Sequence, residues 1–432
     1  MENIKSKEIK LYGMPWYFFA IFAVIVILGT VLGELPGGMI GALPLMIVLG
    51  VVLNKLGSTT PIVKSFLGGG AIVCIFGAAA LNNFGIIPED ASKTIYDFMK
   101  SGGFLNFYIA ALITGSIFGM NRKLLVKAAI RYLPAIIGGV AFAMLLTGLV
   151  GMITGYGAQK AILYICIPIM GGGMGAGAIP LSQIFGESLG IDPGQMLSIM
   201  VPAVALGNAM AVVVGGLLNS IGKKRKSLSG DGALMRNGSY DNEGNSEEFE
   251  KKRNTISLPN LGVGILVSTS FYVAGAIINR FIPSLHTYAC MILLVALVKV
   301  VKVMPEKIEI CCYQWYQFIM KNLTTALLVG IGIAYTNLNQ VADAMSVQYL
   351  LLVTATIVGA TLGAGFVGKL VGFYPIESSI TAGLCMANMG GTGDVAVLSA
   401  SDRMELMPFS QISSRIGGAF MLILSSIILQ II

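Results

Sequence analysis

Long apolar runs separated by short polar loops dominate the chain. A helix needs about 20 apolar residues to cross the hydrocarbon core of a bilayer, and eleven runs approach or reach that length. They lie at 14–33, 38–54, 66–84, 103–120, 132–155, 196–219, 261–280, 284–303, 321–338, 348–371 and 409–431. The pattern predicts an all-α polytopic membrane protein of about eleven transmembrane helices.

Two further apolar stretches, 162–184 and 376–400, are interrupted by glycine clusters. Glycine weakens a helix, and irregular backbone at membrane depth is tolerated only where it is buried in protein or lines a cavity. We therefore expect each stretch to be a re-entrant hairpin, which enters and leaves the membrane on the same side.

The distribution of basic residues supports this interpretation. Lysines and arginines gather in the N-terminal segment and in the loops after the second, fourth and sixth spans, and these loops share one side only if neither hairpin crosses. Since basic loops stay inside, we expect a multi-pass protein of the bacterial inner (cell) membrane, with the N-terminus cytoplasmic and the C-terminus outside. The residues are Lys5, Lys7, Lys10, Lys55, Lys64, Arg122, Lys123, Lys127, Arg131, Lys223, Lys224, Arg225, Lys226, Lys251, Lys252 and Arg253.

A polar segment at 222–260 has almost no apolar residues, and its composition predicts a disordered cytoplasmic linker. It separates a first repeat, 36–221, from a second, 261–432, and an extra helix with a cytoplasmic tail precedes them at 1–35. Each repeat holds five spans and one hairpin. Five is odd, so the repeats enter the membrane from opposite sides, as inverted repeats of secondary transporters do.

Composition agrees with the membrane assignment and excludes several functions. Hydrophobic residues make up 55% of the chain and charged residues only 11%, against about 25% charged residues in soluble domains. The net charge of +7 follows the loops of one side, so we expect no nucleic-acid partner. His286 is the one histidine and the six cysteines lack metal-ligand spacing, so we expect buried thiols, no cofactor and no enzyme.

The candidate chemistry lies in the two glycine-broken stretches. Both contain Gly-Gly-x-Gly, as 172–175 and 390–393, and both reach Leu-Ser a few residues later. Such a break exposes backbone N–H groups, which suit a carboxylate, and carbonyl groups, which suit sodium. Two copies at equivalent places in the two repeats indicate a binding site rather than tight helix packing alone.

Intramembrane charge is a second signal, because a charge there is costly unless it is paired, hydrated or functional. Arg415 starts the last span, and a guanidinium can hold a carboxylate with two parallel hydrogen bonds. Asp394 could cap a half-helix, pair with Arg415 or bind a cation. Glu377, at the mouth of the second stretch, is interpreted as an interface residue.

The motifs at 171–182, 388–399, 404–408 and 413–418, together with the predicted topology, resemble the bacterial 2-hydroxycarboxylate transporter family of citrate and malate carriers. The resemblance covers nearly the whole chain. It implies a homodimer, a dimerisation scaffold, and a mobile transport domain that carries substrate by an elevator-type movement. It also implies a substrate site formed by the hairpin tips and the last span.

Carried over residue by residue, the resemblance implies two sets of ligands. The substrate-binding set is Arg415, Gly175, Met174, Met389, Gly390, Gly391 and Thr392. The sodium set, with backbone and hydroxyl ligands, is Thr392, Ser414, Asn388 and Gly173.

Two positions depart from the citrate–sodium carriers, which have asparagine in place of Met174 and a second arginine in place of Met389. A site with one arginine fits citrate, with its three carboxylates, less well than a smaller acid. We therefore expect a sodium-coupled symporter of malate or a similar di- or monocarboxylate. A proton-coupled symporter, a precursor/product exchanger of citrate, malate or lactate, and an anion channel remain the alternatives.

Overall fold

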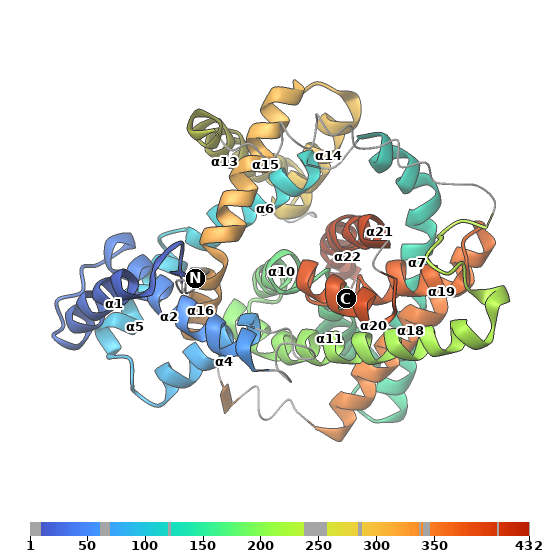
Figure 1. Cartoon of the computed structure of the whole chain (residues 1–432), viewed down its shortest axis with the longest axis horizontal. Coiled ribbons are helices and arrows are strands. Elements are labelled where there is room, and N and C mark those ends of the chain that lie inside the picture. The colour runs from blue at the N-terminus through green and yellow to red at the C-terminus, as the bar shows by residue number, and fades with distance from the viewer. Residues whose placement is uncertain are drawn as a thin grey trace, which may run out of the picture. The chain divides into compact units, whose positions relative to one another are not determined.

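The computed structural model describes residues 10–60, 70–119, 122–236, 257–283, 287–336, 338–339, 346–403 and 406–431. Its regular structure is almost entirely helical (Figure 1). The chain forms two compact units. Unit 1 comprises Met1–Lys64, Gly69–Asn106 and Ile319–Leu338, and unit 2 comprises Ser65–Gly68, Phe107–Phe318 and Asn339–Ile432.

Unit 1 is built from helices that pack through small residues. A side chain at Gly50 would lie 2.8 Å from the backbone of Thr325, and one at Gly332 would overlap the carbonyl of Ile75. Such close approach is typical of helix contacts in membranes. Its elements are β1 (Lys10–Leu11), β2 (Met14–Pro15), α1 (Trp16–Val31), α2 (Met39–Thr59), α4 (Gly70–Asn83), α5 (Glu89–Met99) and α16 (Thr324–Tyr335).

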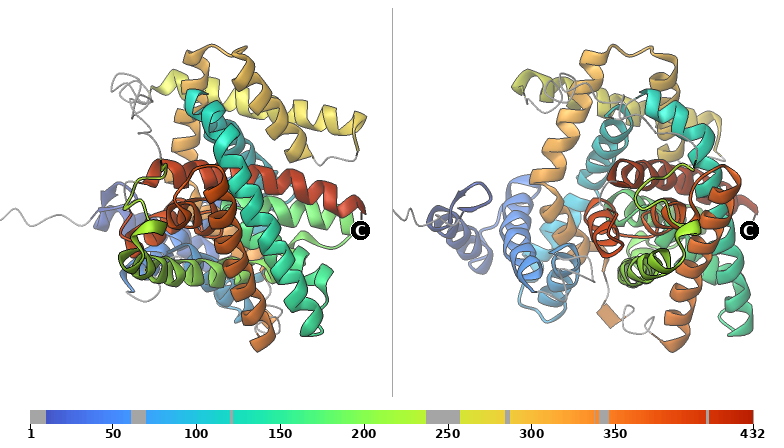
Figure 2. Two further views of the ribbon diagram at one scale, coloured as in Figure 1. Left: turned by 90° about the vertical axis from the view of Figure 1, so that its right-hand side faces the viewer. Right: turned by 45° about the vertical axis from the view of Figure 1, so that its right-hand side comes forward.

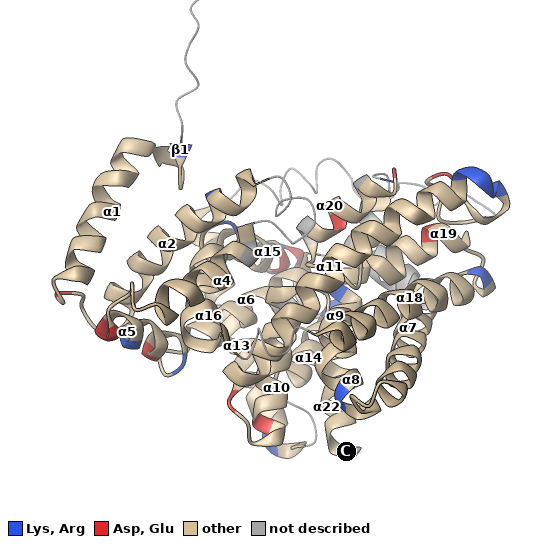
Figure 3. Ribbon diagram, turned by 90° about the horizontal axis from the view of Figure 1, so that it is seen from below, with Lys and Arg blue, Asp and Glu red and all other residues tan. Residues whose placement is uncertain are grey.

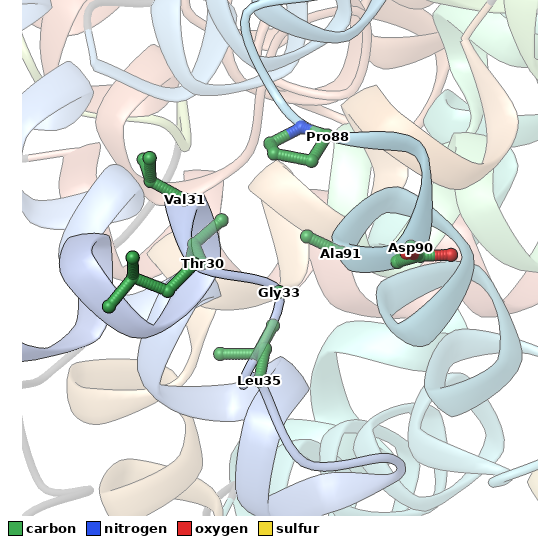
Figure 4. Close-up of a pocket in the computed structure, with 8 residues that line it drawn as sticks. Thr30, Val31, Gly33, Leu35, Pro88, Asp90 and Ala91 are labelled. Carbon is green, nitrogen blue, oxygen red and sulfur yellow. The ribbon is translucent and has the colours of Figure 1, made fainter.

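A pocket of unit 1 lies where α1 ends and α5 begins (Figure 4). Thr30, Val31, Leu35, Pro88 and Ala91 are among its lining residues. The residues predicted to bind substrate or sodium are not part of this lining, so the candidate site has to be sought elsewhere.

Unit 2 contains the long helices and both hairpins. Helices α6 and α15 run from one unit into the other. The helices outside the hairpins are α6 (Phe104–Phe118), α7 (Arg122–Ile153), α11 (Pro193–Lys224), η3 (Lys226–Leu228), α13 (Leu258–Phe281), α14 (Thr287–Val301), α15 (Glu306–Asn322), α18 (Val347–Leu370), α21 (Met407–Ile412), η6 (Ser413–Gly417) and α22 (Gly418–Ile431).

Helices α7 and α18 lie side by side over much of their length (Figures 1 and 2). A side chain at Gly363 would overlap the carbonyl of Gly138, so the two backbones touch there. The hydroxyls of Thr147 and Thr356 are 2.8 Å apart across the same interface. Glycine contacts and a buried hydroxyl pair together hold the helices in one register.

Both glycine-broken stretches are interrupted helices, which we call hairpins 1 and 2, and their re-entry into the membrane stays a prediction. Hairpin 1 consists of α8 (Ala158–Ala161), η1 (Ile162–Cys166), α9 (Ile167–Met170), η2 (Met174–Ala178) and α10 (Ile179–Leu189). Hairpin 2 consists of α19 (Pro375–Ser378), η4 (Ser379–Leu384) and α20 (Gly391–Ala400).

The hairpins enter unit 2 from opposite ends of α18. At its start, Gln348 donates a hydrogen bond to the carbonyl of Thr154, just before hairpin 1. At its other end, Ser378 of hairpin 2 donates to the carbonyl of Ala364. Helix α11 likewise begins beside the end of hairpin 1 and ends beside Ile376 of hairpin 2. Two hairpins that enter from opposite ends can meet only at their tips.

Each of the eleven predicted spans coincides with a helix, but the helices differ in length. Six are long and apolar enough to cross a bilayer, or eight if each bent pair, α5 with α6 (42°) and α15 with α16 (59°), counts as one span. These figures concern the described residues, so the number eleven stays a prediction. Figure 3 shows α11 and α18 uncharged along their middles, with basic residues at one end.

The order of elements is the same in both halves of the chain. Each half has two helices, then a charged helix bent into an apolar one, a long helix, a hairpin and a final helix. The charged members, α5 and α15, were not expected from the sequence. A repeat would produce this order, and both the repeat and its inversion in the membrane stay predictions.

The predicted linker at 222–260 is partly ordered. Helix α11 continues to Lys224, and the following residues reach the start of hairpin 2: Tyr374 donates a backbone hydrogen bond to Leu234, and Arg236 donates one to Gly372. This part therefore differs from the expected disorder, because it pairs with an ordered backbone. Residues 237–256 lie outside the described residues.

Candidate substrate and cation site

The two hairpin tips touch through their glycines. Gly173 has φ +112° and Gly390 has φ +78°, a region that only glycine enters readily. A Cβ on Gly173 would lie 2.9 Å from the carbonyl carbon of Met389, and one on Gly390 would lie 3.5 Å from the oxygen of Gly172. The two unwound backbones approach so closely that a side chain would not fit between them, which explains why both tips carry a Gly-Gly-x-Gly motif.

The last helix closes against the tip of hairpin 1. A Cβ on Gly172, which has φ +79°, would overlap the carbonyl oxygen of Ser414, and one on Gly418 would lie 2.9 Å from the oxygen of Gly171. The two tips and the start of the last helix therefore meet in one place, with α10, α11, α20 and α22 as neighbours (Figure 1).

A buried polar network lies under this meeting point. Asp394, in the first turn of α20, and Asn388 are both 0% exposed. The Asn388 amide donates to Asp394 Oδ1 at 3.0 Å, and its Oδ1 accepts the N–H of Gly390 at 2.8 Å. Asn388 therefore caps the chain before α20, and Asp394 orients that asparagine.

Ser414 joins the last helix to this network. Its hydroxyl lies 2.9 Å from the carbonyl oxygen of Cys385 and 3.0 and 3.1 Å from the two carboxylate oxygens of Asp394. A hydroxyl carries one proton and can donate to one of these oxygens at a time. The remaining oxygens form a cluster of potential ligands, and a hard cation such as sodium requires oxygen ligands. Carbonyl groups of unwound helices supply such ligands in transporters.

Asn208 was not singled out by sequence reasoning, although it is a single amide in the apolar middle of α11. Its Oδ1 accepts the N–H of Met389 at 3.1 Å, and a Cβ on Gly393 would lie 2.6 Å from the same oxygen. It is 2% exposed. A buried amide on a continuous helix thus holds the tip of hairpin 2.

Comparison with known proteins agrees with this architecture. The model of the 2-hydroxycarboxylate transporter family matches residues 11–427. The chain belongs to this family.

Three relatives show the range of names within the family. The malate transporter MleP of Lactococcus lactis subsp. lactis (strain IL1403) is 39% identical over 99% of this chain and 99% of its own length. The citrate transporter CitP of Lactococcus lactis subsp. lactis is 38% identical over 98% and 94%. The Na(+)-malate symporter of Bacillus subtilis (strain 168) is 37% identical over 99% and 94%.

Family membership and the long apolar helices together make the chain a multi-pass protein of the bacterial cell membrane. The family and these relatives are transporters, in agreement with the expectation that the chain is no enzyme. The six cysteines are buried thiols and form no disulfide among the described residues, as their apolar surroundings predict.

The predicted ligands of this family member separate by exposure. Arg415, Gly175, Met389 and Gly390, assigned to substrate, are partly exposed. Gly173, Asn388 and Ser414, assigned to sodium, are buried. Met174 is an exception among the substrate residues, since it is 4% exposed. The side chain of Thr392 is outside the described part of the structure, so its contacts stay a prediction, as does the role of Gly391.

π-Helical turns surround the site. Within the described residues they are η1, η2, η4 and η6, which lie in the two hairpins and at the start of the last helix. Such turns occur frequently at functional sites because they shift a side chain off the α-helical register. Arg415 lies in η6, one residue after Ser414, so the same turn serves both the exposed and the buried part of the site.

The base of hairpin 2 carries an ion pair that sequence reasoning missed. Glu377 is 0% exposed, in contrast to the expected interface residue, and its Oε1 accepts from Arg403 Nε at 3.2 Å. Ser229, from the segment after α11, donates to the same oxygen at 2.9 Å. The pair joins the two ends of the hairpin, which lie 26 residues apart.

Proposed function

We propose that the chain is a sodium-coupled symporter of a 2-hydroxycarboxylate, either malate or a similarly small di- or monocarboxylate. The observation that carries this proposal is the separation of the site into two layers. Partly exposed Arg415 follows Ser414, whose carbonyl meets the tip of hairpin 1, and the Ser414 hydroxyl contacts the buried carboxylate of Asp394.

Arg415 and the tips form the substrate layer. The guanidinium binds one carboxylate with two parallel hydrogen bonds, and the N-terminus of α20 at the tip of hairpin 2 favours an anion as well. Relatives named for malate and for citrate are almost equally similar to this chain, at 39% and 38% identity. The choice of malate therefore rests on Met389, which offers a thioether where a second cation would serve citrate.

Asp394, Ser414, Asn388 and the carbonyl of Cys385 form the cation layer. Its oxygen-rich composition and its burial favour a dehydrated sodium ion, and the name of the Bacillus relative supports sodium. Asp394 is also the group that a proton-coupled symporter would use, so this alternative has a structural basis.

The finer architecture of the transporter is part of the proposal. Both hairpins, α7, α11 and α18 belong to unit 2, which supports a transport domain that moves as one body in an elevator-type cycle. The basic residues at the ends of α11 and α18 lie beside the base of hairpin 2, which supports a cytoplasmic location for that base. A homodimer follows from the family resemblance.

Uptake by purified protein in liposomes tests the proposal. We expect labelled malate to enter, unlabelled malate to compete better than citrate, and internal malate to stimulate entry, as a carrier but not a channel requires. Arg415→Lys should raise the KM for malate about tenfold or more, because a point charge replaces the bidentate guanidinium. Stronger competition by citrate would contradict the substrate assignment, and absence of stimulation would favour an anion channel.

A further inference from the structure

Unsatisfied polar atoms are concentrated along hairpin 2. Among the described residues, six buried side-chain atoms have no hydrogen-bond partner, and three of them are Glu377 Oε2, Tyr132 OH and Ser413 Oγ. A buried polar atom without a partner is energetically costly, so such atoms normally bind ordered water or an ion. Three of them near one hairpin require a common explanation.

These atoms come from the base of hairpin 2, from α7 and from the start of the last helix, and we call the series they form with Thr381 the line. Residues 377, 381 and 385 follow one another along the first arm, through α19 and the π-helical turn η4. Thr381 donates its hydroxyl to the carbonyl of Glu377 at 2.8 Å. The Tyr132 hydroxyl, from α7, lies close to the hydroxyls of Thr381 and Ser413, although no hydrogen bond of good geometry joins it to either.

The far end of this line is the cation layer. Ser413 precedes Ser414, whose hydroxyl lies 2.9 Å from the Cys385 carbonyl and 3.0 Å from Asp394 Oδ1. At the near end, Arg403 and Ser229 hold Oε1 of Glu377 and leave Oε2 without a partner. Carboxylate, hydroxyl and carbonyl oxygens thus succeed one another between the two ends.

The line is enclosed by protein. Glu377, Thr381 and Ser413 are 0% exposed and Tyr132 is 2% exposed. The rings of Phe373 and Phe409 lie 6.0 and 6.3 Å from that of Tyr132. Polar groups enclosed in an apolar bundle mark ion pathways in membrane proteins, and binding along such a path must be weak enough for the ion to leave.

We propose that Glu377, Thr381, Tyr132 and Ser413 form a hydrated track along which the coupling cation passes between the Asp394–Ser414 site and the base of hairpin 2. The track takes a small monovalent cation and the waters that accompany it. This inference rests on the proposed sodium coupling, but its residues lie outside the binding site.

Two variants, Tyr132→Phe and Ser413→Ala, test the track, with Tyr288→Phe as control because Tyr288 is on α14 and is also 2% exposed. We would compare net malate uptake driven by a sodium gradient with malate–malate exchange at saturating sodium on both sides. Net uptake needs the release of sodium in each cycle, whereas exchange does not. Each track variant should slow net uptake about tenfold, the effect of one lost hydrogen bond. The rate of malate–malate exchange should stay within about twofold of the wild-type rate. Exchange does not use the track, so the substitution should change its barrier by no more than about 0.5 kcal/mol.

Sodium affinity and thermal stability complete the test. The track variants should leave the calorimetric Kd for sodium unchanged and should not raise Tm, since a hydroxyl that binds water has no penalty to relieve. Unchanged net uptake, equal slowing of both modes, a weaker sodium Kd, or a higher Tm would each overturn the track. If the wild-type protein itself shows no sodium-driven uptake, the proposed coupling fails and the track fails with it.

Discussion

Asp394 and Ser414 show how two buried side chains from different elements can define a cation site. The carboxylate lies at the start of α20 and the hydroxyl comes from η6, yet they approach to 3.0 Å. The sequence predicted Asp394 as a candidate because its charge interrupts an apolar stretch, whereas Ser414 was predicted through the family resemblance. It left the role of Asp394 open, and the structure places its hydrogen bonds with Asn388 and Ser414.

Asp394→Asn tests the cation layer. The substitution keeps the shape of the side chain and removes its charge, so sodium loses a charge-assisted ligand, and its apparent affinity in uptake should fall about tenfold or more. Ser426→Ala is the control, since that buried hydroxyl bonds only within its own helix, to Leu422. Unchanged sodium dependence in the Asp394 variant would remove this residue from the site.

Met389→Arg tests the choice of substrate. The side chain is partly exposed and its own backbone N–H is fixed by Asn208. A second guanidinium at this tip should improve competition by citrate about tenfold, the value of one additional charged hydrogen bond. Met389→Gln adds polarity without charge and should leave the malate preference unchanged. Equal citrate competition in the arginine variant and the wild type would refute the assignment.

The breaks in the two apolar stretches were better predicted than the amphipathic helices. Glycine clusters at 172–175 and 390–393 lie where the helices of each stretch are interrupted, and re-entry into the membrane stays a prediction. The sequence did not predict helices α5 and α15, because their charged residues, such as Glu89 and Glu306, interrupt the apolar pattern. The Glu377–Arg403 ion pair was not predicted either, because its two residues are 26 positions apart and no local sequence pattern connects them.

Gly173→Ala tests the contact between the tips. The position combines φ +112° with a Cβ that would lie 2.9 Å from the carbonyl carbon of Met389, so the tips must separate or the backbone must strain by about 1–3 kcal/mol. We expect uptake to fall at least tenfold at unchanged expression. Gly262→Ala is the control, because it is helical in α13 and a Cβ there meets nothing within 4 Å. Normal uptake by the Gly173 variant would mean that the tips do not need to touch.

At the scale of the whole molecule, the two units suggest which parts move together. Helices α7 and α18 belong to the same unit as both hairpins and touch through glycine and threonine. The division into units could not be read from the sequence, since it joins segments that are far apart along the chain, such as α2 and α16.

A disulfide across α7 and α18 tests whether they move as one body. Thr147→Cys with Thr356→Cys, in a Cys166→Ala background, places two thiols where hydroxyls lie 2.8 Å apart. Because both helices travel together in the proposed cycle, the oxidised protein should keep most of its uptake. Loss of uptake on oxidation, with recovery on reduction, would show that α7 and α18 must slide past each other.

The central claim is that sodium drives a small 2-hydroxycarboxylate through this site. Uptake of labelled malate by purified protein in liposomes, with an imposed sodium gradient at equal pH on both sides, measures it directly. We predict accumulation above the equilibrium level that collapses when the sodium gradient is removed. Accumulation that is indifferent to sodium and follows an imposed pH gradient instead would contradict the account.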